Sequence, residues 1–564
     1  MSPSNLVGDM LDTFDHVVVL MLENRSFDNL LGYMYPNGVP ADAPLGKTFE
    51  GVTGQNLSNP VPPGVKNPPP PGVTTIPVSP VEAGNYFQPY PDPGENYVHV
   101  NTQLFNLIDG GDQPPYNLPG QRPLPQPDMK GFIKDYIENY KAAEVPGQDP
   151  TYDAPPADFP WTGYKQIMQC YPTSAVPVVT TLAAEFGVFD HWFCAVPSET
   201  WCNRTFWNAG TSWGFVINPP ESDHLSQLRW LLDSNGPTIF NQIENSGGTS
   251  PLTWKIYTAN IVSATAIIHA LALKDYWPLT LTPDFRLVPN PRNRMFLIND
   301  FLSDCGAGKR PAYSFLEPRF FTPQNDMHPS TSGAWGDGSG PGDPGPVLLG
   351  DSLVWQVYDA IRNSPKRDRT LLIITFDEHG GCYDHVPPPG HVTPPDLTGD
   401  PLEDNFDFTR LGVRVPTIMV SSHIATNTVV KTPMHHGSFM NTVRKKWDKM
   451  APGKFPPLTA RVADAPNFSE VFTSAAPRPK EDWPEIPKPV IPEEFWARDF
   501  SRAPLSEFQR SILIGASMLP EPRKAMARAA VPRDPSAINT TGEAMEYLKS
   551  IPGVGPEEPL STFK

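Results

Sequence analysis

The sequence DHVVVLMLENRSFDNLLGY, residues Asp15–Tyr33, decides the fold. Its apolar run Val17–Leu22 is unbroken and polar residues follow it. A short apolar run between polar residues is typical of a central strand of a parallel α/β sheet, which is buried on both faces. Such sheets bind ligands beyond the carboxyl ends of their strands, where Glu23 and Asn24 offer oxygen donors that suit a divalent cation. The alternative interpretation is an ordinary loop with an N-cap at Ser26.

A second segment, LLIITFDEHGGCYDHVPPP at Leu371–Pro389, repeats this pattern. Asp377 and Glu378 follow its apolar strand, and two glycines make the turn after them. Adjacent carboxylates repel each other unless a cation lies between them. Two unrelated solvated loops are the alternative interpretation. Because parallel strands end at the same edge of a sheet, we expect four ligands of one ion there, namely Glu23, Asn24, Asp377 and Glu378.

Helices and strands alternate along much of the chain. Ser174–Asp190 predicts a helix that leads into a strand, and the helical spacing of apolar residues in Leu353–Ile361 predicts a helix before the second acidic strand. Val413–Ser421 predicts a further buried strand, although Pro416 is unusual in a central strand. This alternation predicts the α/β class with a parallel sheet.

The 564 residues exceed a typical domain, but α/β enzymes often reach this length as one domain with insertions. The 72 prolines far exceed the ~5% of an average chain. They gather in a Pro/Gly-rich stretch at residues 36–96 and beyond residue 475. We therefore expect a catalytic domain at residues 1–474, with 36–96 as an insertion. Residues 475–564 are expected to pack on the core or to act as a recognition module.

Four motifs along the chain resemble those of a bacterial phosphoesterase family. That family contains phosphatidylcholine-type phospholipases C and a metal-dependent acid phosphatase. The resemblance extends from residue 16 to about residue 447 and is most specific in the first motif. The four motifs are ENRSFD at Glu23–Asp28, VPSETWCNR at Val196–Arg204, NDMHP at Asn325–Pro329, and TFDEHGG followed by DHVPPP at Thr375–Pro389.

The resemblance implies an alkaline-phosphatase-like α/β fold: a central, mostly parallel sheet flanked by helices, with long Pro/Gly-rich loop insertions. It implies Thr200 as a nucleophile, whose alkoxide a divalent ion favours. The motif departs from the family pattern at Ser198, Glu199 and Cys202, so Ser198 stays an alternative nucleophile. The metal implied is zinc, held by Glu23, Asn24, Thr200, Asp377 and Glu378.

The resemblance also assigns roles to other polar residues. Asn203 and Arg204 carry donors that a phosphoryl group needs. Histidine suits proton transfer near neutral pH. Asp326 lies two residues before His328 and is expected to orient that imidazole or a neighbouring one. His435 is adjacent to His436, so the choice between these two histidines stays open. The three candidate histidines are His99, His328 and His436.

The net charge of −18 argues against nucleic acid as a partner and against simple electrostatic attraction to anionic lipid surfaces. A phospholipid or a small phosphoester remains a compatible substrate, and peripheral contact with a membrane remains open. No window reaches the ~18 apolar residues of a membrane span. The N-terminus lacks the basic and apolar regions of a signal peptide. We expect a protein made in the cytoplasm, with secretion by a signal-independent route left open.

These features predict a metal-dependent phospholipase C that cleaves phosphatidylcholine-like lipids through a covalent phosphothreonine. An acid phosphatase with the same site is the alternative. A more distant alternative is a metal-independent serine esterase, because GTSWG at Gly210–Gly214 matches the GxSxG pattern and would make Ser212 the nucleophile. A binding protein without catalysis is a third class, and it would make both acidic strand ends accidental.

Overall fold

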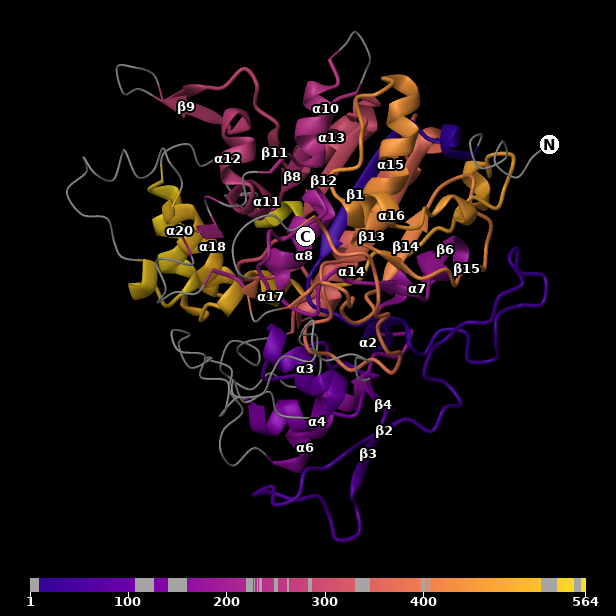
Figure 1. Cartoon of the computed structure of the whole chain (residues 1–564), viewed down its shortest axis with the longest axis vertical. Helices are drawn as coiled ribbons and strands as arrows, with labels where there is room; N and C mark the ends of the chain where they lie inside the picture. The colour runs from indigo at the N-terminus through magenta and orange to yellow at the C-terminus, as the bar shows by residue number, and fades with distance from the viewer. Residues whose placement is uncertain are drawn as a thin grey trace.

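The computed structural model shows an α/β protein built around one large sheet (Figure 1). It describes residues 10–106, 126–139, 160–219, 227, 229–230, 232, 236–247, 252–260, 263–281, 287–329, 345–396, 402–403, 406–518, 535–551 and 559–563. Among these residues the sheet has eight strands in the order β11-β8-β12-β1-β13-β14-β6-β15.

The two acidic motifs follow strands that lie side by side at the centre of this sheet. β1 (His16–Leu22) and β13 (Thr370–Phe376) pair in parallel, with Leu22 opposite Phe376 at their carboxyl ends. β12 (Tyr313–Glu317) flanks β1 on the other side, also in parallel. Every residue of β13 is buried, as a central strand between two helical layers requires. The two predicted strands and their common edge are therefore confirmed.

The sheet is mostly parallel, as predicted. β14 (Thr417–Val420) begins directly after Pro416 and is antiparallel to both of its neighbours. Proline lacks an N–H group for the ladder, so a strand that begins after it keeps its hydrogen bonds complete. The remaining strands are β11 (Met295–Leu297), β8 (Trp254–Thr258), β6 (Gly187–Phe189) and β15 (Thr428–Val430).

Helices cover both faces of the sheet. Side chains alternate between faces along a strand, and in β8 Trp254 contacts Phe240 of one layer while Tyr257 contacts Phe301 of the other. The predicted helices before β6 and β13 are confirmed as α7 and α14. The first layer contains α8 (Thr200–Ala209), α10 (Ile239–Asn245) and α15 (His436–Met450), and the second contains α7 (Pro177–Glu185), α13 (Ile298–Ala307) and α14 (Gly345–Arg362).

A cap, formed by residues 50–106, 126–139 and 160–170, lies beyond the carboxyl edge of the sheet (Figure 1). It includes much of the Pro/Gly-rich stretch, which forms only short strands among its loops. Its core gathers around α3 (Tyr97–Phe105) and α4 (Phe132–Lys134), where Val100, Leu104 and Phe132 are buried. The cap therefore has an apolar centre of its own and places polar residues over the strand ends.

The C-terminal extension packs on both helical layers, with Trp483 against Tyr358 of α14 and with two helices on the side of α8. α18 (Glu507–Met518) and α20 (Thr541–Lys549) share an apolar cluster with residues of α8. The indole Nε1 of Trp201 donates to Ser511 Oγ at 2.8 Å, and Gln509 Nε2 donates to the Phe320 carbonyl at 2.6 Å. The described part of residues 475–564 thus supports the segment that carries Thr200, while the domain boundary at residue 474 stays a prediction.

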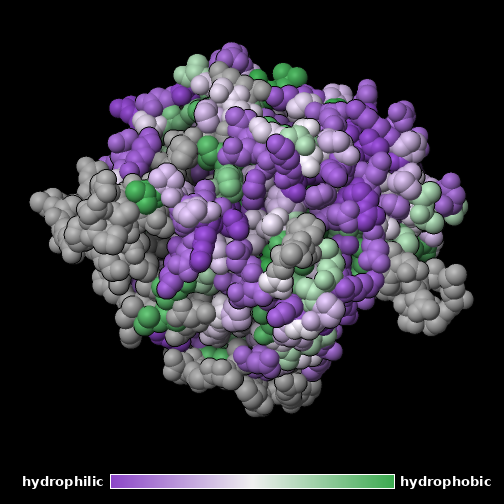
Figure 2. Space-filling model, turned by 90° about the horizontal axis from the view of Figure 1, so that it is seen from above, coloured by the Kyte–Doolittle hydropathy of each residue, from purple (hydrophilic) through white to green (hydrophobic). Residues whose placement is uncertain are grey.

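No helix in the described part of the chain is both long and apolar enough to cross a membrane. Figure 2 shows the face opposite the cap, where hydrophilic residues dominate and hydrophobic ones form small separate patches. The most exposed large apolar side chain among the described residues is Val490, at 83%. Isolated exposed apolar residues of this kind are ordinary on a protein surface.

A buried ion-pair cluster fastens the strand ends to one another. Arg414 Nη2 lies 2.9 Å from Asp28 Oδ1, and its Nε lies 2.9 Å from Asp384 Oδ1. Arg414 Nη1 also donates to the Asp190 carbonyl at 2.7 Å, directly after β6. His385 Nδ1 is 2.6 Å from Asp28 Oδ2. One guanidinium therefore bridges both aspartates, with His385 as a further partner of Asp28, and joins segments that follow three different strands.

We predict that Arg414→Ala lowers the free energy of unfolding by about 3–5 kcal/mol, because it leaves two fully buried carboxylates without their cation. Denaturant unfolding of the purified protein measures this change. Arg369→Ala is the matched control, since its pair with Asp15 is exposed and worth less than about 1 kcal/mol. Equal losses in the two variants would contradict the role of the buried cluster.

Candidate active site

The ends of three parallel strands place acidic residues at one buried edge. Glu23 and Asn24 follow β1, and Asp377 and Glu378 follow β13. The loop after β12 brings Asp326, whose carbonyl accepts a hydrogen bond from the Glu23 backbone N–H at 2.8 Å. All five side chains are fully buried. The structure therefore brings together the four residues that the two acidic strand ends predicted, and adds Asp326 to them.

Thr200 comes to this edge as the first residue of α8. Its Oγ1 lies 3.1 Å from Glu23 Oε2 and 3.5 Å from Asn24 Oδ1. The start of a helix favours negative charge, because unpaired N–H groups and the helix dipole are directed there. The start of α8 would therefore favour negative charge beside Thr200.

Asn24 has an unusual backbone that a glycine makes possible. Its φ of +57° lies in the left-handed region, which residues other than glycine rarely adopt. Its backbone N–H donates to Asp377 Oδ1 at 3.3 Å, which ties the two strand ends together. A Cβ on Gly380 would lie 2.3 Å from the Asn24 carbonyl oxygen, so only glycine allows this approach.

The buried carboxylates carry more negative charge than the protein neutralises. Arg204 is the guanidinium in contact with Glu23 and Asp377. Among the described residues, Asp326 Oδ2 and Glu378 Oε1 are buried and accept no hydrogen bond. Such oxygens are costly to bury without a partner. A divalent cation fits this set of oxygen donors and would supply the missing positive charge.

The pKa values of the buried carboxyls also reflect this excess of negative charge. Burial, with Asp377 and Asp326 close by, raises the pKa of Glu23 well above its ordinary value despite Arg204. Burial followed by the neighbouring Asp377 raises the pKa of Glu378 in the same way. Burial raises the pKa of Asp326 to about 8. Without a cation, burial and mutual repulsion therefore favour the protonated forms of these carboxyls, and metal binding would compete with those protons.

The two predicted substrate-binding residues differ in their contacts. Arg204 donates to Glu23 from Nε and Nη2, while its buried Nη1 has no hydrogen-bond partner among the described residues. This N–H group therefore has a hydrogen bond left to donate. Asn203 instead uses its amide on the loop before Thr200, with Nδ2 donating to the Ser198 carbonyl at 2.7 Å and Oδ1 accepting from Val196 N–H at 3.0 Å. Its contact with substrate stays a prediction.

His436 is the member of the His435–His436 pair that reaches the acidic edge. Its Nε2 lies 2.6 Å from the Asp377 carbonyl oxygen, and its Nδ1 accepts from Trp192 Nε1 at 3.3 Å. Nε2 therefore carries the proton in the neutral ring. Burial lowers the pKa of His436 to about 4, which keeps the ring neutral. His435 caps α15 instead, accepting from the Gly437 N–H at 3.1 Å.

His328 also lies at the site, but Asp326 does not orient its imidazole. Asp326 Oδ1 accepts from the backbone N–H of His328 at 3.0 Å. The ring Nδ1 lies 2.8 Å from the Pro329 carbonyl, and Nε2 lies 3.0 Å from Asn24 Nδ2. Burial lowers the pKa of His328 to about 4. The aspartate thus shapes the loop, because a residue two positions away reaches the main chain more easily than the ring.

His99 lies in the cap, with a partner that sequence reasoning missed. Its Nδ1 is 2.8 Å from Asp135 Oδ1, and both side chains are buried. Gln103 Nε2 donates to the other Asp135 oxygen at 2.7 Å, and its Oε1 lies 2.7 Å from His379 Nε2. These bonds link His99 to the residue after Glu378. A lone aspartate on a short helix has no pattern that distinguishes it in the sequence.

Two further acidic residues of the cap were missed. Asp92 Oδ2 is 3.5 Å from His328 Nδ1, and Glu95 Oε2 is 3.9 Å from His328 Nε2. Ligand atoms of these three residues lie within 4.8 Å of one another. Both acids belong to the proline-rich stretch PDPGEN, whose composition predicts only a surface loop.

The alternative serine nucleophiles are placed differently. Ser198 Oγ donates to the Val216 carbonyl. Ser212 Oγ donates to the Phe215 carbonyl at 2.6 Å. Ser212 follows Gly210, which ends α8 in a left-handed conformation. A nucleophile elbow requires a strand before the serine and a helix after it, so the structure contradicts that interpretation of Ser212.

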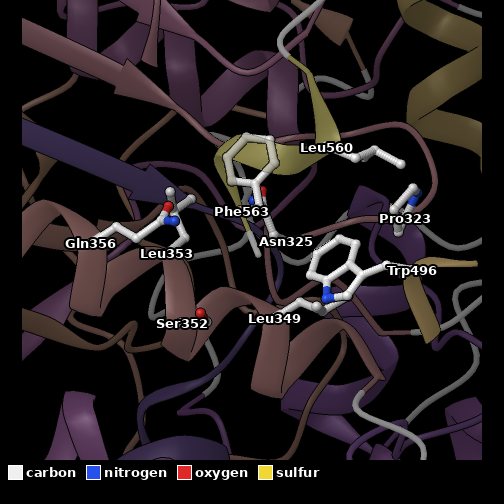
Figure 3. A pocket seen from close by; sticks show the side chains of 9 residues that line it. All are labelled: Pro323, Asn325, Leu349, Ser352, Leu353, Gln356, Trp496, Leu560 and Phe563. Atoms are coloured by element: carbon white, nitrogen blue, oxygen red, sulfur yellow. The ribbon is translucent and has the colours of Figure 1, made fainter. Parts of the chain in front are cut away.

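A small cavity of about 280 Å³, counting its share of open solvent, lies behind the loop that carries Asp326 (Figure 3). Aromatic and aliphatic side chains from α14 and from the C-terminal extension surround it. None of the predicted site residues lines it, so it is separate from the acidic edge. Its lining residues are Pro323, Asn325, Leu349, Ser352, Leu353, Gln356, Trp496, Leu560 and Phe563.

Comparison with known proteins supports a hydrolytic role for this edge. Residues 14–450 match the Phosphoesterase family. Non-specific phospholipase C6 of Arabidopsis thaliana is 32% identical, over 94% of this chain and 85% of its own. Phospholipase C B of Mycobacterium tuberculosis is 25% identical, over 85% of this chain and 81% of its own. A solved protein of the alkaline phosphatase superfamily from Vibrio parahaemolyticus covers 53% of this chain with 11% identity and a TM-score of 0.30, too low to support an argument.

The family match covers all four motifs that suggested the resemblance. Its relatives come from a plant as well as from a bacterium. The central residues of the first and last motifs meet at one buried edge, and Thr200 of the second motif contacts two of them. On this evidence the chain belongs to the phosphoesterase family and is a phosphoric ester hydrolase.

Proposed function

We propose that this hydrolase is a phospholipase C that cleaves phosphatidylcholine-like phospholipids to diacylglycerol and a phosphorylated head group. The observation that carries the proposal is the contact of the Thr200 hydroxyl with Glu23 and Asn24 at the start of α8. Relatives named as phospholipases C, which align with nearly the whole chain, support the choice of substrate.

The reaction has two displacements at phosphorus. Thr200 Oγ1 loses its proton and forms a bond to phosphorus while the bond to the glycerol oxygen breaks, and that oxygen takes up a proton. A water molecule then attacks phosphorus, breaks its bond to Thr200, and releases the phosphorylated head group. Arg204 Nη1 supplies a hydrogen bond to the phosphoryl oxygens, where negative charge develops.

We assign a divalent metal, zinc by family resemblance, to Glu23, Asn24, Thr200, Asp377 and Glu378. When bound, the ion lowers the pKa of the nucleophile and neutralises phosphoryl charge. The unpaired Glu378 Oε1 and the raised carboxyl pKa values support this assignment.

We assign proton transfer to His99. Of the three candidate histidines, it makes the closest contact with a carboxylate, at 2.8 Å from Asp135. A carboxylate on Nδ1 fixes the tautomer and stabilises the imidazolium that a proton donor must form. His436 holds the Asp377 carbonyl instead.

We predict that Thr200→Ala lowers turnover at least ~10⁴-fold, as loss of a nucleophile does in other hydrolases. Thr200→Ser should keep part of the activity because its hydroxyl survives. The controls Ser198→Ala and Ser212→Ala should stay close to wild type, since each removes a hydroxyl bonded to a carbonyl. Acid quenching and peptide mapping should place phosphate on Thr200. Phosphate on Ser198 would refute the assignment.

We predict that metal removal and substrate choice together identify the activity. Chelation should abolish hydrolysis of phosphatidylcholine and of a simple phosphomonoester, and added zinc should restore it. Asp377→Ala should lower activity at least ~10²-fold. Phosphatidylcholine should be the better substrate of the metal-loaded enzyme. Faster hydrolysis of the phosphomonoester than of phosphatidylcholine would establish the phosphatase alternative. Esterase activity that survives chelation would establish the serine esterase alternative.

We predict that the metal-free protein loses stability as pH rises. Burial raises the pKa of Asp326 in the folded state to about 8, against an ordinary 3.8. Between these two pH values the folded state therefore binds more protons than the unfolded state. The free energy of unfolding then falls with rising pH, by up to about 1.4 kcal/mol per pH unit for each such group. Melting temperatures at pH 5 and pH 8 measure the slope, which saturating zinc should reduce. Equal slopes with and without zinc would contradict a cation at these carboxyls.

A further inference from the structure

The side chain of Asn24 can serve the site in only one of two orientations. Its amide has one oxygen, which accepts or coordinates, and one NH₂ group, which only donates. A half-turn of the amide exchanges them with almost no change in shape. In the structure Oδ1 lies 3.5 Å from Thr200 Oγ1, on the side of the nucleophile. Some feature of the protein must therefore hold the NH₂ group on the opposite side.

Two acceptors face that NH₂ group. Asn24 Nδ2 donates to Glu95 Oε2 and lies 3.0 Å from His328 Nε2. The His328 ring places its proton on Nδ1, 2.8 Å from the Pro329 carbonyl, so Nε2 presents a lone pair. Both N–H bonds of the amide thus have an acceptor, and the reversed orientation would set the amide oxygen against two acceptors.

Glu95 is held in place by the cap. The next residue, Asn96, caps α3 by accepting from the His99 N–H at 3.3 Å, which fixes the backbone at this point. The Glu95 side chain is 9% exposed, so water replaces its hydrogen bond poorly. Glu95 also interacts with Glu378, a second candidate ligand. One carboxylate from the cap therefore contacts side chains that follow both central strands.

We propose that Glu95 is a positioning residue that fixes the Asn24 amide with its oxygen toward Thr200 and the metal, with His328 as the second acceptor. The inference rests on the proposed metal site. Hydrogen bonds to metal-binding side chains commonly change metal affinity 10–100-fold. The cap would thus determine how tightly the strand ends hold the ion.

The same geometry argues against a separate cation held by Asp92, Glu95 and His328. The proton on His328 Nδ1 is directed at Pro329, and Nε2 faces an N–H donor of Asn24. A cation among these residues would lie against that NH₂ group. Hydrogen bonding accounts for the short contacts of Glu95 and His328 without an additional ion.

The test compares zinc affinity and stoichiometry across Glu95 variants of the full chain, by competition with a chromophoric chelator. Glu95→Ala should raise the Kd for zinc 10–100-fold at unchanged stoichiometry. Glu95→Gln keeps an acceptor oxygen and should restore at least about half of that loss on a logarithmic scale. Glu82→Ala, on an exposed residue of the same stretch, is the matched control. Melting temperatures verify that each variant folds.

The Asn24→Asp variant separates the effect of Glu95 on the orientation of the amide from the effect of its charge. In Asn24→Asp, both carboxylate oxygens are alike and no orientation needs to be fixed. Adding Glu95→Ala there should leave zinc affinity unchanged or improve it, because repulsion between carboxylates is removed. The inference would be overturned if Glu95→Ala lowers zinc affinity equally with Asn24 and with Asp at position 24. It would also be overturned if Glu95→Gln binds zinc as weakly as Glu95→Ala. A fall from two zinc ions to one would identify a second metal site. A wild type that binds no zinc would refute the proposed function itself.

Discussion

The structure depends on negative charge that is buried at the carboxyl edge of the central sheet. Glu23, Asp326, Asp377 and Glu378 converge there, and the guanidinium of Arg204 supplies one positive charge against them. Burial alone raises carboxyl pKa values, and mutual repulsion raises them further. Such an arrangement is stable only with protons or with a cation. The same charge would bind a divalent ion and activate a hydroxyl beside it.

A second acidic cluster nearby shows the opposite solution. Asp28 and Asp384 are equally buried, but Arg414 bridges them, His385 lies against Asp28, and no carboxylate oxygen of the two lacks a hydrogen-bond partner among the described residues. That cluster is complete without an ion, so it holds strand ends together. The contrast separates structural from functional carboxylates: where the protein's own cations satisfy the oxygens the role is structural, and where oxygens stay unpaired a ligand is expected.

The cap contributes polar residues to the carboxyl edge of the sheet. It is formed from the stretch with the least regular sequence, yet it supplies Glu95 and the His99–Asp135 pair to the edge of the sheet. The C-terminal extension supports the site from another side, through the contact of Ser511 with Trp201, the neighbour of Thr200. Segments far apart in the chain therefore fix the nucleophile and its surroundings.

The sequence alone determined the sheet and its acidic edge. The apolar runs before Glu23 and Asp377 indicated buried parallel strands, and such strands must end at one edge whatever the loops do. The neighbourhood of Thr200 came only through family resemblance. The roles of Asp326, His328, Asp135 and Glu95 were decided by tertiary structure. Most of these roles depend on which nitrogen or oxygen faces a partner that lies tens or hundreds of residues away in the chain. Hydrogen-bond direction between distant segments leaves no periodic trace in a sequence.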